Sequence, residues 1–131
     1  MKEQAKQFFA HYGNTFDTWD MKKFSSFFHE PFISIRGDGT SRIMQDNIEA
    51  EIFFTSVLAK WKRDGYVKFS TKDYEVISLG TKSMLVTFTW QMMNKEDKII
   101  KEWRQSYNLI NENQTWKIIM STFHLEDKRN S

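Results

Sequence analysis

Residues 82–93 read KSMLVTFTWQMM, and this stretch decides the fold of the chain. Every second residue in it is large and apolar, which is the pattern of a strand with one buried face. The inward set is Met84, Val86, Phe88, Trp90 and Met92. Such a strand is about twice the usual length, and long strands stay compact only in a sheet that twists and coils strongly. We therefore expect a curved sheet that closes over an aromatic core.

Three further stretches also have the pattern of long strands. They span residues 66–79, 98–110 and 116–125, and the segments between them are short and have turn composition. Connections of hairpin length join antiparallel neighbours, so the four strands form a meander. In the third strand the inward set is Trp103, Gln105, Tyr107 and Leu109. The last strand is apolar on both faces, which predicts that a second copy packs on the sheet as a homodimer.

The first half of the chain predicts helices and one short strand. Apolar residues at spacings of three and four predict a helix over residues 2–18, with Gly13 inside it where another element approaches closely. Asp20 begins a short second helix with Phe27 and Phe28 on its inner face, and Pro31 ends that helix. A strand over 32–36 and a turn at 37–39 follow. A helix over 46–64, apolar over more than half its circumference, is expected to be buried on several sides.

These elements define one α+β domain over residues 1–131, with a polar tail at 126–131. The predicted architecture is a curved antiparallel sheet wrapped around a long helix, a cone of the cystatin-like roll type. A chain of 131 residues has the usual size of a single domain.

The composition excludes several kinds of function. The formal charge is only +2 and the basic residues are scattered, so nucleic acid is not an expected partner. The chain has no cysteine and its three histidines lack metal-ligand spacing, so we expect neither a metal nor a cofactor. No apolar run approaches the roughly 20 residues that a membrane span needs, and the start lacks a secretory signal. These features predict a cytoplasmic domain without membrane contact.

The order of elements and several residues resemble the nuclear transport factor 2-like superfamily, the α+β cone that ketosteroid isomerases and SnoaL-type polyketide cyclases share. The resemblance covers nearly the whole chain. It rests on the apolar face of the first helix, which ends at Phe16, and on Asp20 at the start of the second helix. It also rests on Phe28 to Pro31, which lead into the first strand, and on residues 107–110 (YNLI) followed by 116–119 (WKII). The cone hosts isomerases, dehydratases, cyclases, transport adaptors and dimerisation modules, so the resemblance implies a fold and leaves the function open.

The resemblance also implies a way to test for isomerase chemistry. Isomerase-like members place a tyrosine eight positions before the Asp of the second helix, and Tyr12 and Asp20 keep this spacing. Counting onward places the family's catalytic base at Arg36, which stays protonated and cannot be a base. Asp38 has the same strand parity, although a turn also explains it. The residues therefore predict no catalytic group: Tyr12 is first of all a core aromatic, and Tyr12 with Asp38 is the one pair that isomerase chemistry could use.

The leading prediction is a cavity that binds a small, largely apolar ligand, such as a hydrophobic acid or a polycyclic compound. Candidate ligand-binding residues are Tyr12, Arg36, Trp90, Trp103, Gln105, Tyr107 and His124. Arg36 would bind an acidic group there, or would otherwise lie in solvent beside Asp38 or Glu30. The alternatives are an assembly module without a ligand, and an isomerase, dehydratase or cyclase that needs no cofactor.

One expectation concerns carboxylates. The inward sets of the second and third strands contain no Asp or Glu, so we expect no carboxylate within reach of the Tyr12 hydroxyl. Only Asp17, Asp38 and Asp73 are placed where they could turn inward. Without such a group, proton transfer would be absent or very slow, because a tyrosine alone supplies half of an acid–base pair.

Overall fold

The computed structural model of the chain describes residues 1–124, so Leu125 and the predicted polar tail lie outside the described residues. Its elements follow one another along the chain in this order: α1 (Lys2–Asp17), α2 (Met21–Ser25), β1 (Phe28–Ile35), β2 (Ser41–Met44), α3 (Asn47–Arg63), β3 (Lys68–Ser78), β4 (Ser83–Met93), β5 (Ile99–Glu112) and β6 (Thr115–Phe123). Within residues 1–124, no helix combines the length and the hydropathy that crossing a membrane requires.

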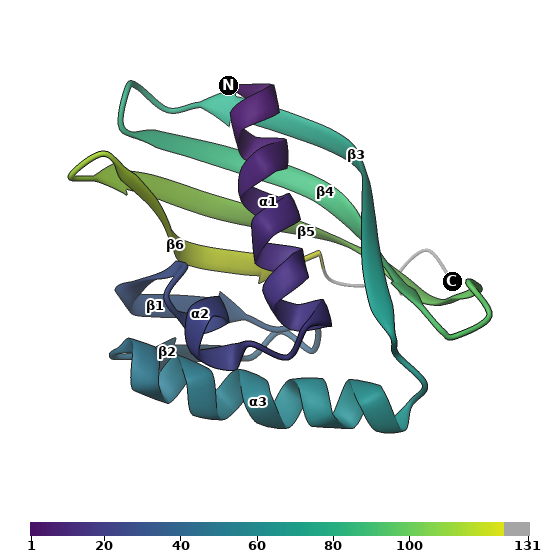
Figure 1. Ribbon diagram of the computed structural model, residues 1–131. Helices are drawn as coiled ribbons and strands as arrows, with labels where there is room; N and C mark the ends of the chain where they lie inside the picture. The colour runs from purple at the N-terminus through teal and green to yellow at the C-terminus, as the bar shows by residue number, and fades with distance from the viewer. Residues whose placement is uncertain (125–131) are drawn as a thin grey trace.

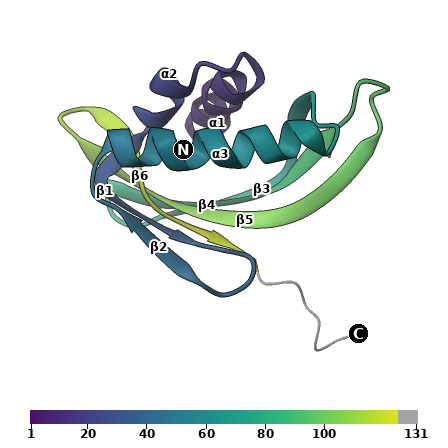
Figure 2. The same cartoon turned by 90° about the horizontal axis from the view of Figure 1, so that it is seen from below.

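The strands form one sheet in the order β2-β1-β6-β5-β4-β3. Strands β3 to β6 pair as the antiparallel meander predicted from the sequence. The β1–β2 hairpin joins this meander through a parallel pairing of β1 with β6. The long strands curve, and α1, α2 and α3 lie on the concave side of the sheet (Figures 1 and 2). The predicted α+β cone is therefore confirmed.

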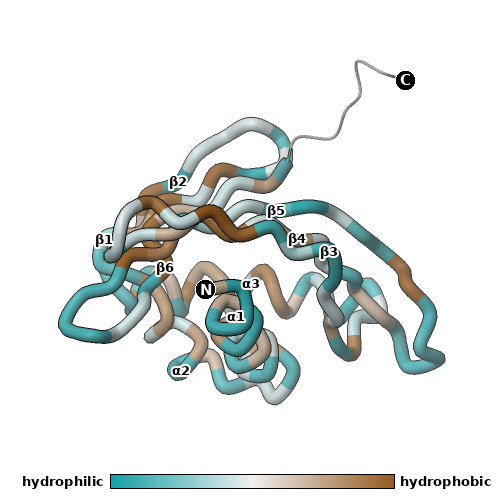
Figure 3. Tube along the Cα trace, turned by 90° about the horizontal axis from the view of Figure 1, so that it is seen from above, coloured by the Kyte–Doolittle hydropathy of each residue, from teal (hydrophilic) through white to brown (hydrophobic). Residues whose placement is uncertain are grey.

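The core lies between the concave face of the sheet and the helices. The five inward residues predicted on β4 are at most 3% exposed, as are Tyr107 and Leu109 on β5. From α1, Phe9 and Tyr12 pack against this wall, with Phe9 touching both Phe88 and Tyr107. Hydrophobic residues also gather where β1, β2 and β6 lie together (Figure 3).

The helix ends follow the predicted capping chemistry. The Asp20 carboxylate accepts a hydrogen bond from the Lys23 amide, and the Asp46 carboxylate accepts one from the Glu49 amide. Gly65 follows α3 with a φ of 102°, a conformation that glycine adopts without strain. Such side-chain caps satisfy amides that have no partner within the helix, which explains why both helices begin where the sequence indicated.

Two predictions about the first half were wrong. The second helix ends at Ser25, and Phe28 begins β1, where its ring stacks on Phe54 at 5.2 Å. The strand therefore contains Pro31 and starts four residues before the predicted one. Helix α3 buries one face only, since Ile48 and Ile52 are each 69% exposed. The sheet offers α3 a single surface, and no described element covers its other side.

Strand β6 changes its inward face part-way along its length. Ile118 pairs with Leu109 while Met120 pairs with Asn108, so one extra residue lies between them. A bulge of this kind moves all later side chains to the opposite face. Ile118 is fully buried, but beyond the bulge Ser121 and Phe123 face inward in place of Met120 and Thr122. This switch accounts for the apolar residues on both faces of the strand.

Candidate functional site

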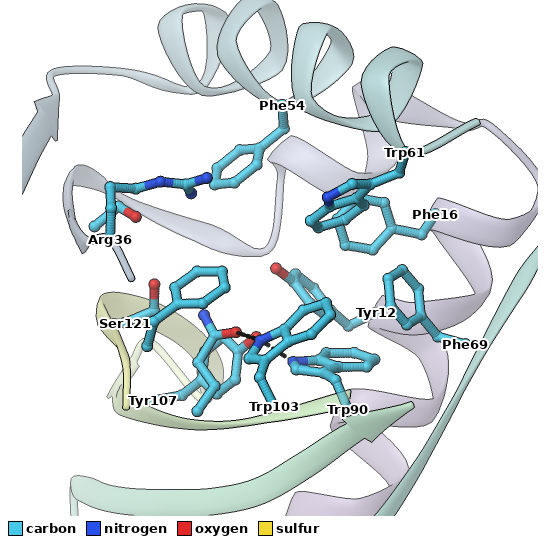
Figure 4. Close-up of a pocket in the computed structure, with 13 residues that line it drawn as sticks. Tyr12, Phe16, Arg36, Phe54, Trp61, Phe69, Trp90, Trp103, Tyr107 and Ser121 are labelled. Carbon is cyan, nitrogen blue, oxygen red and sulfur yellow. Dashed lines mark hydrogen bonds between the residues drawn. The ribbon is translucent and has the colours of Figure 1, made fainter. Parts of the chain in front are cut away.

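A pocket lies inside the wide part of the cone, between the concave sheet and helices α1 and α3. Every strand except β2 contributes side chains to its lining. Thirteen side chains line the pocket (Figure 4): Tyr12 and Phe16 from α1, Ser34 and Arg36 from β1 and its end, Phe54 and Trp61 from α3, Phe69 from β3, Trp90 from β4, Trp103, Gln105 and Tyr107 from β5, and Ser121 and Phe123 from β6.

The pocket is narrow. The space between its side chains, including what is open to solvent, is about 370 Å³, but the centre of a water molecule can reach only about 20 Å³ of it. One water needs roughly 10–15 Å³ on this measure, so the pocket has room for one or two waters. The sequence predicted an apolar cavity large enough for polycyclic compounds, and such a compound does not fit this conformation.

Hydrogen bonds fix the aromatic wall. The Trp90 indole donates to the buried Tyr107 hydroxyl at 2.8 Å, and the Trp103 indole donates to Gln105 Oε1 at 2.9 Å. Trp103 also stacks on Phe123, with ring centres 5.6 Å apart and an angle of 14° between the rings. Both Trp103 and Phe123 are half-buried, so this pair belongs to the part of the wall that reaches solvent, as do Arg36, Trp61 and Phe69.

The polar side of the pocket has donors without acceptors. Ser34 is fully buried, and within residues 1–124 its hydroxyl has no hydrogen-bond partner. Arg36 reaches into the pocket opposite the Tyr12 hydroxyl (Figure 4) and forms no ion pair with any described residue. Its guanidinium carbon lies 5.2 Å from the centre of the Phe53 ring and 5.0 Å from that of Phe123. None of the thirteen lining residues is Asp or Glu.

Burial shifts the pKa values of the ionisable groups in the pocket. Burial, followed by the neighbouring Tyr107, raises the pKa of Tyr12 well above its ordinary value, and the charge of Arg36 opposes this rise only in part. Burial raises the pKa of Tyr107 too, although the hydrogen bond from Trp90 works against it. Desolvation lowers the pKa of Arg36, which nevertheless remains a cation at neutral pH. At neutral pH the pocket thus holds one positive charge and neutral hydroxyls.

Comparison with known proteins identifies the family. Residues 2–126 match the family described as NTF2-like protein (DUF6841). The chain belongs to this family. No curated protein matches the sequence.

Solved structures with the NTF2-like or cystatin-like fold agree with the arrangement described above. A cystatin-like protein of unknown function from Nostoc punctiforme has a TM-score of 0.76 at 13% identity, with 97% of this chain and 92% of that chain covered. Aln2 from a Streptomyces species has a TM-score of 0.76 at 12% identity, with coverages of 94% and 89%. An NTF2-like protein of unknown function from Shewanella oneidensis has a TM-score of 0.71 at 13% identity, with coverages of 92% and 96%. At these identities the likeness extends to the fold alone.

The NTF2-like cone brings six of the seven residues predicted for the ligand site into one pocket: Tyr12, Arg36, Trp90, Trp103, Gln105 and Tyr107. His124, the seventh residue predicted for the ligand site, does not line the pocket, so its placement there was wrong. Because of the bulge in β6, His124 lies exposed on the convex face, where its Nε2 is 2.9 Å from Ser106 Oγ.

The carboxylates that might have turned inward are occupied elsewhere. Asp38 is exposed and accepts hydrogen bonds from the amide and hydroxyl of Thr40, which lower the pKa of this carboxyl. The Asp17 carboxylate, at the end of α1, accepts a hydrogen bond from the Tyr66 hydroxyl, and burial raises the pKa of Asp17. Asp73 is exposed in the irregular part of β3. The candidate pair of Tyr12 and Asp38 is therefore not brought together.

Sequence reasoning missed much of the opposite wall. Ser34 and Ser121 are Cα partners in the parallel pairing of β1 with β6, so their side chains share one face. Because Ser34 is two residues from Arg36, it has the same strand parity, and this could have indicated that Ser34 lines the pocket. Nothing local in the sequence indicated Ser121 or Phe123, since the bulge reverses their parity. In the described part of the chain, no group of three His, Asp or Glu side chains could hold a metal ion.

Proposed function

We propose that the pocket binds a small organic acid, with the acidic group held by Arg36 and Ser34 and the apolar body held by the aromatic wall. The observation that carries this proposal is the Ser34 hydroxyl, which is fully buried beside Arg36 and has no partner among the described residues. An unsatisfied buried polar group costs about 1–3 kcal/mol, so an acceptor that enters the pocket relieves a cost already present.

The charge of Arg36 specifies the kind of acceptor. A half-buried guanidinium without an ion pair favours a carboxylate or a similar oxyanion, which it can bind with two parallel hydrogen bonds. The pocket has no carboxylate of its own to compete for this cation, and its remaining walls are mostly aromatic. An acid with an apolar body therefore matches both parts of the lining.

The volume limits the size of the ligand. With room for one or two waters, even a single ring requires side chains to move. Trp103 and Phe123 are two of the half-buried lining residues, and separating them breaks one hydrogen bond and one aromatic stack. These contacts are worth about 1–3 kcal/mol together, a cost that binding must exceed. We infer a small acid bound with modest affinity.

Binding is favoured over proton transfer by the groups available. The ionisable side chains of the lining are Arg36 and two tyrosines whose pKa values burial has raised, so none of them is a base near neutral pH. Tyr12 could donate a hydrogen bond to an oxyanion, as in an isomerase, but none of the lining residues is a carboxylate that could accept the proton.

Tryptophan fluorescence can test the proposal, because three of the five tryptophans line the pocket. We expect saturable changes on titration with benzoate and none with benzamide, which has the same ring and no charge. Arg36→Gln should weaken benzoate binding at least tenfold, as loss of a hydrogen bond to a charged group costs about 1.5–3 kcal/mol. Arg63→Gln, at an exposed arginine on the end of α3, is the matched control. Equal binding of benzamide, or no saturable signal with benzoate, would overturn the proposal.

We propose as a second function that two copies pair through the convex face of the sheet. The strand register aligns one outward residue from each strand in a row, and five of the six are apolar. From β3 to β2 the row is Ile77, Leu85, Asn108, Met120, Ile33 and Ile43. The strands of the row also carry charges of both signs, since Arg104 pairs with Glu75 and Lys72 with Glu102. A face with this composition can pack on its own copy without like-charge repulsion.

Light scattering coupled to size-exclusion chromatography tests the pairing. We expect a dimer at micromolar concentration and a folded monomer for Met120→Lys, because this substitution puts a charge in the middle of the row. Ile52→Lys, at an exposed isoleucine of α3, should leave the dimer intact. A wild-type monomer at these concentrations would contradict the proposal.

A further inference from the structure

A second arginine lies beside the pocket and is not part of its lining. Arg42 on β2 is the Cα partner of Ser34 on β1. Residues directly opposite each other in an antiparallel pair point to the same face of the sheet, so Arg42 projects to the concave side, as Ser34 does. Arg36, two residues after Ser34, shares that parity. The β1–β2 hairpin therefore presents two arginines and one buried hydroxyl on a single face.

The two guanidinium groups meet at one aromatic ring. The guanidinium carbon of Arg42 lies 4.6 Å from the centre of the Phe53 ring, and that of Arg36 lies 5.2 Å from the same point. Since both carbons are about 5 Å from one ring centre, they are no more than about 10 Å apart. Arg36 lines the pocket, whereas Arg42 is exposed and does not line it, so the pair extends from the pocket to its solvent-facing edge, called its mouth below.

The positive charge of this pair is balanced only in part, because Asp38 is the one carboxylate that acts on Arg36 among the described residues. Neither arginine forms an ion pair within residues 1–124. Asp38, in the hairpin turn, attracts Arg36 but is held by two hydrogen bonds from Thr40. Desolvation lowers the pKa of Arg36, the negative charge of Asp38 opposes this, and the like charge of Arg42 lowers the pKa by a smaller amount. Two cations that repel each other beside an apolar ring favour a ligand that neutralises both.

We propose that the ligand of this pocket is a doubly charged acid, whose first anionic group is bound by Arg36 and Ser34 and whose second is bound by Arg42 at the mouth. This inference rests on the proposed acid-binding function and narrows its ligand class. Arg36 is half-buried and Arg42 is exposed, so the second contact is the weaker one, and it acts mainly by selecting dianions over monoanions.

Benzoate and phthalate separate the two proposals, because both consist of one benzene ring and differ in the number of carboxylates. Titrations at pH 7.5 in low salt are expected to give phthalate a Kd about fivefold lower than that of benzoate, which corresponds to the ~1 kcal/mol of an exposed charge contact. In Arg42→Gln this preference should fall below twofold while the benzoate Kd stays within about twofold of the wild-type value. In the Arg63→Gln control the preference should persist. It should also shrink at high salt.

Each outcome bears on one proposal. If benzoate binds and phthalate binds no more tightly, or if the preference survives Arg42→Gln, the second contact does not exist and only this inference fails. If neither compound binds, the acid-binding function fails and this inference fails with it. Thermal melts of each variant establish that a change in Kd does not reflect unfolding, and we expect Arg42→Gln to melt like the wild type because its side chain is exposed.

Discussion

Replacing Ser34 by alanine should stabilise the protein and weaken its binding of acids at the same time. The hydroxyl is fully buried and has no partner among the described residues, so its desolvation is not compensated. Removing such a group recovers about 1–3 kcal/mol. For a domain of 131 residues each kcal/mol corresponds to about 3–5 °C in Tm, so we expect a rise of roughly 3–15 °C. A water held in the pocket would place the change near the lower limit.

Ser25 provides the matched control. It is equally buried, at 2% exposed, but its hydroxyl donates to the Lys22 carbonyl at 2.9 Å. Ser25→Ala removes a satisfied hydrogen bond and should lower the free energy of unfolding by about 0.5–1.5 kcal/mol. Urea denaturation of the three proteins, followed by tryptophan fluorescence, gives these differences directly, and benzoate titration of each gives the Kd.

The two substitutions should move stability in opposite directions, and only Ser34→Ala should raise the benzoate Kd, by about tenfold. If Ser34→Ala destabilises the chain as much as Ser25→Ala does, the Ser34 hydroxyl has a partner in the free protein. An acceptor that enters the pocket would then relieve no existing cost, and the basis for proposing one would be refuted. A stabilised Ser34→Ala variant with unchanged benzoate affinity would refute the role of Ser34 in binding alone.

Three further predictions concern stability. Tyr107→Phe leaves the buried Trp90 indole without an acceptor and should lower the free energy of unfolding by about 1–3 kcal/mol, with a less than additive loss when Trp90→Phe is added. Gly13→Ala should raise the free energy of unfolding by up to about 1 kcal/mol, since an added Cβ would meet the Trp90 ring at an ordinary 3.9 Å. A lower free energy of unfolding in urea would contradict this. Burial raises the pKa of all four tyrosines, so the unfolded chain loses these protons first as the pH rises. The free energy of unfolding should therefore hold below about pH 10 and fall above it, by up to about 1.4 kcal/mol per pH unit for each tyrosine that stays protonated in the folded chain. The buried Tyr12 and Tyr107 should contribute phenolate absorbance only on unfolding.

The sequence predicted those parts of the fold that depend on regular alternation. On β4 the residues at even positions from Met84 to Met92 are buried, because an uninterrupted strand keeps its parity from end to end. The pocket residues on β4 and β5 were predicted for the same reason. Capping chemistry was equally local, so Asp20 was also placed correctly at the start of the second helix.

Features that depend on contacts distant in sequence were not predictable in this way. The single extra residue near Ile119 reverses the faces of β6 and exchanges His124 for Phe123 in the pocket. The parallel pairing of β1 with β6 extends β1 back to Phe28, although the local pattern there resembles the end of a helix. Whether the Ser34 hydroxyl finds a hydrogen-bond partner depends on the side chains that β2 and β6 place beside it. No local pattern in the sequence predicts that it has none.

The parallel pairing of β1 with β6 also has a consequence for biosynthesis. Ser34 and Ser121 are partners although β2 to β5 and α3 lie between them in sequence, so the polar wall of the pocket cannot form until almost all of the described chain has left the ribosome. Until then β1 has an open edge, with backbone groups available to pair with another chain. A nascent chain that ends after β5 would therefore contain Ser34 and Arg36, but β1 would lack the β6 edge that holds these residues against the rest of the sheet. An acid in the cell would stabilise only the finished protein, by mass action, and would not assist the intermediates in which misassembly begins.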